Sequence, residues 1–219
     1  FNQCSIFPTK HGCVVKRQRR HMPDPFEYSR ATSWPVSVTH GQAFADNVPR
    51  WGEHLAAVGL DGSLTYRQLR GRAERLLDVL PPGNGRVALL SDNALPYVVG
   101  QAAIYLAAHC GVLLDPADPT GRLRKMLANV QVDALLVSSA RLGLALELED
   151  LINGPIVEIT DAGPQPGATS RAVAARDPSA EVVIVFTSGS TGTPKGTVVS
   201  ERCSRFAAIG STRQRLNRR

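Results

Sequence analysis

Short runs of apolar residues alternate along this chain with longer segments in which apolar residues recur at helical spacing. Continuous apolar runs at 87–90, 112–114 and 134–137 fit strands that are buried in the sheet, and 156–159 is predicted as a fourth strand. Helical spacing marks the segments between them, at 95–108, 120–130 and 142–151. Because strands alternate with helices, the pattern predicts an α/β fold with a mostly parallel sheet flanked by helices.

Two helices are expected before the first of these strands. Thr39 is placed to cap a short helix through Asn47, and Pro49 marks its end. Thr65 followed three residues later by Gln68 forms a capping-box pattern for the next helix. That helix places four apolar residues on one face: Leu69, Ala73, Leu76 and Leu80.

The stretch from Asn93 to Leu114 contains no Lys, Arg, Asp or Glu and is the one candidate membrane span. Pro96, Gly100 and His109 interrupt it, and its length is marginal for a bilayer. We therefore expect a buried helix that runs into a buried strand.

The composition changes abruptly after the apolar run Val182–Phe186. Residues 187–196 read TSGSTGTPKG, so a buried strand is followed by hydroxyls, glycines and Lys195. Glycines let backbone N–H groups approach phosphate oxygens, while hydroxyls and a lysine add donors and charge. The pattern departs from the ordinary phosphate loop, because Pro194 stands where its second glycine belongs and Gly196 where Ser or Thr belongs. A flexible Gly/Ser connector is the alternative.

The segment FTSGSTGTPKG at 186–196 resembles the phosphate-loop signature of the adenylate-forming (acyl-activating, AMP-binding) superfamily. Two weaker resemblances lie upstream, at 63–69 (SLTYRQL) and within 105–136, where Leu114-Asp115-Pro116 precedes Arg122-Leu123. Within this superfamily, these segments are most similar to those of nonribosomal peptide synthetase-type adenylation domains. The resemblance extends over about residues 39–200. It implies the N-terminal part of the large domain of such an enzyme.

The resemblance also implies a chemistry: ATP and a carboxylic or amino acid give an acyl-adenylate, and the acyl group then passes to a thiol of CoA or a carrier protein. Mg²⁺ is the implied metal. Lys195 is implied to contact phosphate and is not the catalytic lysine of the family, so no catalytic residue is assigned. The implied nucleotide-binding residues are Thr187, Ser188, Gly189, Ser190, Thr191, Gly192, Thr193, Lys195 and Gly196.

The net charge of +6 is concentrated at the two ends of the chain. Residues 1–21 carry five basic and no acidic side chains, and residues 202–219 carry six basic and no acidic ones, so the body is acidic. This distribution argues against a nucleic-acid partner. We expect an extension at 1–38, the adenylation-type portion at 39–200 and a truncated basic tail at 201–219.

Four cysteines without close pairing indicate free thiols in a cytoplasmic protein, with no metal site. The later motifs of the superfamily do not occur in the chain, so we expect that it does not complete the reaction alone. A non-catalytic remnant or a regulatory nucleotide-binding module stays open as an alternative. Glu201 stands where the superfamily often has His, and we expect its carboxylate to lie near the triphosphate and to repel it.

Overall fold

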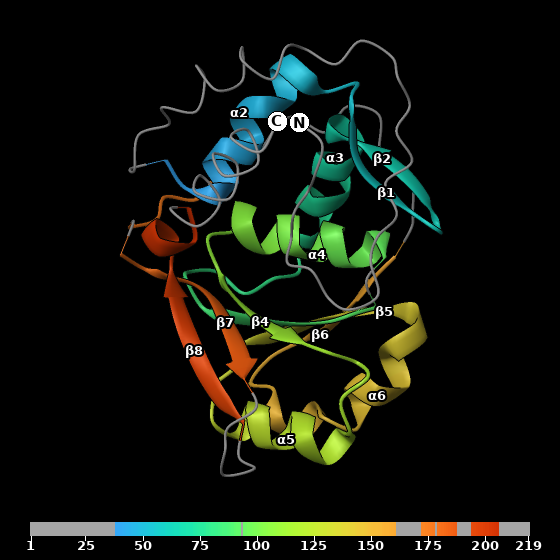
Figure 1. Cartoon of the computed structure of the whole chain (residues 1–219), viewed down its shortest axis with the longest axis vertical. Helices are drawn as coiled ribbons and strands as arrows, with labels where there is room; N and C mark the ends of the chain where they lie inside the picture. Colours follow the sequence, from blue (N-terminus) through green and yellow to red (C-terminus); the bar gives the residue numbers. More distant parts are fainter. Residues whose placement is uncertain (1–37, 93, 161–171, 178, 188–193, 206–219) are drawn as a thin grey trace, which may run out of the picture.

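The computed structural model describes residues 38–92, 94–160, 172–177, 179–187 and 194–205. Within them a six-stranded sheet lies between two layers of helices, and a small two-stranded sheet stands at one side (Figure 1). In chain order the elements are α2 (His40–Trp51), β1 (Leu55–Gly59), β2 (Gly62–Thr65), α3 (Tyr66–Leu76), β3 (Arg86–Leu90), α4 (Leu95–Leu106), β4 (Cys110–Leu114), α5 (Thr120–Ala128), β5 (Ala134–Ser138), α6 (Leu142–Leu146), β6 (Ile156–Ile159), β7 (Glu181–Thr187) and β8 (Lys195–Ser200).

The large sheet has the strand order β6-β5-β3-β4-β7-β8. The first five of these strands pair in parallel, and β8 alone runs antiparallel, against β7. The predicted α/β architecture with a mostly parallel sheet is confirmed.

Alternate residues of the central strands pack on opposite faces of the sheet. Val87 and Leu89 of β3 join one core with α2, α3 and α4, whereas Ala88 and Leu90 join a second core with α5 and α6. Figure 1 shows these two helical layers above and below the sheet. Burial on both faces explains why β3 reads as a continuous apolar run rather than an alternating one.

The uncharged stretch at 93–114 divides into α4 and β4, both largely buried, as the sequence predicts. Ala108 between them adopts a positive φ of 60°, which lets the chain turn sharply from helix to strand. Among the described residues, the helices are all too short or too polar to cross a membrane.

The capping box at the start of α3 is confirmed in both directions. The Thr65 hydroxyl accepts from the Gln68 backbone N–H at 3.2 Å, and the Gln68 side chain accepts from the Thr65 N–H at 2.9 Å. All four apolar residues assigned to the buried face are buried, although the α-helix itself ends at Leu76.

The prediction that the first helix ends before Pro49 is wrong. Pro49 lies inside α2, which continues to Trp51. Proline has no N–H for the carbonyl four residues earlier, which here belongs to Ala45. The Arg70 Nη1 donates to that carbonyl at 3.3 Å, so the lost helical bond is replaced from α3.

Two further boundaries differ from the prediction. The expected helix at 142–151 is the shorter α6 followed by a 3-10 turn, Glu149–Leu151. The β1–β2 hairpin is not among the predicted elements, and β1 (LAAVG) buries only Ala57 although four of its five residues are apolar. Its turn depends on Gly62, whose φ of 131° favours glycine.

Candidate functional site

The segment singled out by the sequence is the connection between β7 and β8. β7 pairs in parallel with β4 through Gly111↔Val183 and Val112↔Ile184, so it is anchored in the core of the sheet. β8 returns antiparallel beside it, and the register places Thr187 opposite Lys195. The two ends of the polar segment are therefore held side by side as the last pair of a hairpin.

Three of the nine predicted nucleotide-binding residues belong to the described structure: Thr187, Lys195 and Gly196. Thr187 and Lys195 are both exposed, and within the described part of the chain Lys195 has neither an ion pair nor a side-chain hydrogen bond. The other six lie outside the described residues: Ser188, Gly189, Ser190, Thr191, Gly192 and Thr193.

Gly196 has a packing role that the sequence does not reveal. A Cβ added there would lie 3.2 Å from Ile184 Cγ2 and 3.3 Å from Phe186 Cε1. Glycine at this position lets β8 approach the side chains of β7 closely.

The hairpin ends at the edge of the sheet where ligands of α/β proteins usually bind. The connection from β3 enters α4 on one face of the sheet, and the connection from the neighbouring β4 enters α5 on the other. Such a reversal of strand order opens a crevice outside the carboxyl ends of the strands. Thr187, the last residue of β7, lies at this carboxyl edge.

One ion pair at the same edge has no counterpart among the sequence predictions. Arg141, just after β5, donates to both carboxylate oxygens of Asp92, just after β3, at 2.9 and 2.6 Å. The hydrogen bond from Arg141 is the main reason that the pKa of Asp92 lies below its usual range. Because 49 residues separate the partners and neither belongs to a local motif, no sequence signal pairs them.

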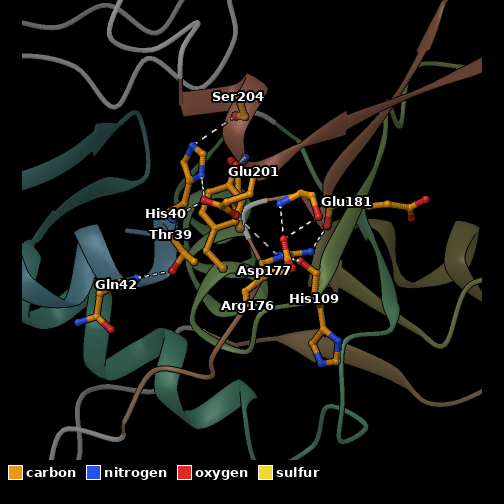
Figure 2. A network of polar contacts seen from close by, with 12 residues as sticks. Thr39, His40, Gln42, His109, Arg176, Asp177, Glu181, Glu201 and Ser204 are labelled. Carbon is orange, nitrogen blue, oxygen red and sulfur yellow. Dashed lines mark hydrogen bonds and ion pairs between the residues drawn. The ribbon is translucent and has the colours of Figure 1, made fainter. Parts of the chain in front are cut away.

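Glu201 does not lie beside Lys195, the residue expected to contact the triphosphate. β8 runs for six residues from Lys195 to Ser200, so Glu201 lies roughly 20 Å from Lys195, at the opposite end of the strand. Its side chain is 2% exposed and faces α2, where His40 donates from its backbone N–H at 2.5 Å and from Nδ1 (Figure 2).

Burial alone would raise the pKa of Glu201, but the hydrogen bonds and charge of His40 and the charge of Arg176 hold it below its usual range. Glu201 is therefore ionised in the folded protein and joins α2 to the end of β8. Glu201, which replaces the superfamily's usual His, is thus accommodated by its contact with His40.

A second set of polar contacts ties the amino ends of the strands together. Arg86 of β3 donates to both carboxylate oxygens of Glu181 in β7, at 2.9 and 3.0 Å. Arg176 donates to the carbonyl oxygens of His109 and Glu181 (Figure 2). These contacts fix β7, and with it the hairpin that carries the polar segment.

No group of three or more His, Cys, Asp or Glu side chains suited to a metal ion occurs among the described residues. Cys110 is buried and Cys203 is exposed, and both are free thiols. Burial raises the pKa of Cys110 to about 11. Cys4 and Cys13 lie outside the described residues.

Comparison with curated proteins finds relatives among the peptide synthetases. The chain is 35% identical over 168 residues to malpinin synthetase of Mortierella alpina, and the match covers 74% of this chain and 2% of that protein. It is 28% identical over 205 residues to surfactin synthase subunit 2 of Bacillus subtilis, covering 92% and 6%. The chain thus spans a small fraction of the length of these relatives.

Solved structures share the fold at lower identity. The anthranilate CoA ligase AuaEII in complex with anthranoyl-AMP superposes with a TM-score of 0.66 at 17% identity, over 78% of this chain and 35% of that one. The nonribosomal peptide synthetase FmoA3, in its α-methyl-L-serine-AMP-bound form, gives 0.64 at 20% identity, over 84% and 20%.

The family model described as AMP-binding enzyme matches residues 44–216, which include both strands of the hairpin and the polar segment between them. This chain belongs to the AMP-binding enzyme family.

Proposed function

We propose that this chain supplies the triphosphate-binding part of an ATP-dependent enzyme that activates a carboxylic or amino acid as its adenylate. The observation that carries the proposal is the pairing of Thr187 with Lys195 at the carboxyl edge of the sheet. It brings a hydroxyl and an exposed ammonium group to the two ends of the Gly/Ser/Thr segment, on the strands next to β4 in the sheet.

The residues present suit a polyphosphate. Lys195 is exposed and pairs with none of the described acidic side chains, so its charge is available to β- and γ-phosphate oxygens. The segment it closes, with Ser188, Ser190, Thr191 and its glycines, supplies hydroxyl and backbone donors in our proposal.

In the proposed mechanism this chain contributes positioning and charge. Lys195 and the segment hold the terminal phosphates, which leaves the α-phosphorus open to in-line attack by a carboxylate oxygen. Mg²⁺, when bound, offsets charge on the phosphates. Among the described residues, no group of three or more His, Cys, Asp or Glu side chains would hold it.

Titration of the chain with ATP tests the nucleotide part of the proposal. Lys195→Ala should weaken ATP binding by about 10- to 100-fold, which is the usual cost of a charged hydrogen bond. Lys125→Ala is the matched control, because Lys125 is an exposed lysine on α5, and its affinity should equal that of the unaltered chain. AMP should bind more weakly than ATP. Equal affinities for Lys195→Ala and the unaltered chain would refute the site.

Acid activation is tested with the full-length gene product. ATP–pyrophosphate exchange that depends on an added carboxylic or amino acid is the expected result, followed by transfer to CoA or a carrier-protein thiol. ATP binding without exchange across a broad panel of acids would instead indicate a nucleotide-binding module without this activity.

A further inference from the structure

Three side chains at the far end of β8 form a hydrogen-bonded relay that the proposed nucleotide site does not use. The Ser204 Oγ lies 3.3 Å from His40 Nε2, and His40 Nδ1 contacts Glu201 Oε1 (Figure 2). His40 begins α2 and is more than 160 residues away in sequence from the other two, so only the tertiary fold brings the three together.

The hydrogen bonds define a direction along this relay. The ionised carboxylate of Glu201 only accepts hydrogen bonds, so Nδ1 of His40 carries the proton that it receives. Nε2, on the other side of the ring, faces the Ser204 hydroxyl, and the proposed chemistry uses the form of the ring in which Nε2 carries no proton. A buried acid that orients an imidazole toward a serine hydroxyl is the arrangement that activates serine as a nucleophile.

The exposed fractions of the three side chains differ in the way that such chemistry needs. The side chain of Glu201 is 2% exposed and that of His40 is 21% exposed, while Ser204 is half-buried. The serine and the imidazole are thus reachable from solvent, and the acid is not.

A buried cation stands beside the relay. Glu201, Ser204 and Arg205 share one face of the helical segment at 201–205, by their spacing of three and four residues. Arg205 is 9% exposed, and its Nη1 has no hydrogen-bond partner among the described residues. This cation lies close enough to Glu201 to interact with its charge.

We propose that Ser204, His40 and Glu201 form a second reactive site, which accepts small acyl groups from activated esters or thioesters onto Ser204. A bond forms between Oγ and the acyl carbon while the hydroxyl proton passes to His40 Nε2. The bond from the acyl carbon to the alkoxide or thiolate then breaks, and the leaving group takes that proton. A water molecule then gives a proton to the same imidazole and bonds to the acyl carbon, the bond from that carbon to Oγ breaks, and Oγ takes the proton as the free acid leaves. This site needs no nucleotide and lies at the end of β8 opposite Lys195.

A fluorophosphonate probe tests the proposal directly on the 219-residue chain without ATP. Its phosphorus forms a bond with a serine Oγ as fluoride leaves, and peptide mass spectrometry locates and times the adduct. At about pH 8, Ser204 should be labelled about 10² to 10⁴ times faster than the exposed Ser63, which has no such relay.

Two variants separate reactivity from folding. Ser204→Ala should remove the adduct and leave the melting temperature nearly unchanged. His40→Gln keeps the backbone donor and an amide for Glu201 but removes the base, so labelling of Ser204 should fall to the rate of Ser63. Labelling of Ser204 no faster than Ser63 in the unaltered chain, or at the same rate in a folded His40→Gln variant, would overturn the proposal and leave the relay as a structural clamp on α2.

Discussion

The backbone of Gly41 in α2 lies against the carbonyl group of Tyr105 in α4. A Cβ at position 41 would stand 2.3 Å from the Tyr105 oxygen and 2.9 Å from its carbonyl carbon. Both atoms belong to the backbone, so a side-chain rotation cannot relieve the overlap. Gly41 is therefore what allows α2 to dock closely on α4, and α2 in turn carries His40 to Glu201.

Gly41→Ala should consequently destabilise the fold by about 1–3 kcal/mol, the usual cost of overpacking. Gly121→Ala is the matched control in α5, where an added Cβ meets nothing within 4 Å. That substitution should leave stability unchanged or raise it by up to about 1 kcal/mol. Urea unfolding of both variants checks the difference, and equal midpoints would contradict the close approach of α2 and α4.

Arg70 stabilises the proline-containing turn of α2. Its Nε donates to the buried Glu74 at 2.8 Å and its Nη1 to the Ala45 carbonyl. Arg70→Met should cost about 2–4 kcal/mol in unfolding free energy, because it removes charged hydrogen bonds from a buried place. Arg67→Met, which disrupts the exposed pair with Glu53, should cost less than about 1 kcal/mol.

A double-mutant cycle isolates the bond to Ala45. With Pro49→Ala in place, the amide of residue 49 can donate to the Ala45 carbonyl itself. The cost of Arg70→Met should then fall by about 1 kcal/mol, the net value of one hydrogen bond. Strictly additive unfolding energies would show that Arg70 and Pro49 act independently.

Stability should depend on acid through Glu201. Its pKa in the folded protein lies below the ordinary 4.5, so its ionised form stabilises the fold at neutral pH. This contribution is complete above about pH 4.5 and is lost as the pH falls through the lower, folded-state value. Melting temperatures between pH 7 and pH 3 should therefore drop less steeply in Glu201→Gln than in the unaltered chain.

The matched control for this pH dependence is Glu53→Gln, since Glu53 is 77% exposed and pairs only at the surface. Its melting temperatures should follow the unaltered curve at every pH. A Glu201→Gln profile that also follows that curve would mean that the buried carboxylate contributes no acid dependence.

The two described cysteines should differ sharply in reactivity. Burial raises the pKa of Cys110 to about 11, so at about pH 8 it should react at least about 100-fold more slowly than a thiol of ordinary pKa. Cys203 is exposed and should be modified first. Timed alkylation with peptide mass spectrometry checks the order. Rapid labelling of Cys110 under native conditions would contradict its burial in β4.

Local patterns predicted much of this fold correctly. The Thr65–Gln68 capping box, the division of 93–114 into helix and strand, and the parallel sheet all follow from neighbours in sequence and from apolar period. The predicted β7 strand is also confirmed, because a β-branched apolar run buried on both faces leaves few alternatives.

Two of the errors occurred where distant residues decide the outcome. The path of α2 through Pro49 depends on Arg70, and the surroundings of Glu201 depend on His40, 161 residues away. The Asp92–Arg141 pair likewise exists only because β3 and β5 are neighbours in the sheet. Such contacts require loop closure over tens of residues, so the local sequence around one residue does not indicate which distant residue it will contact.

The sequence alone thus determined the class of fold and the residue types of the polar segment. Both follow from the spacing of apolar residues and from the chemistry of residues that are neighbours in the chain. Only the tertiary structure decided that Thr187 faces Lys195 across a hairpin, that Glu201 is buried at the other end of the same strand, and that Ser204 meets His40. These relations depend on strand order and register, which arise when separate segments bury their apolar faces against one another.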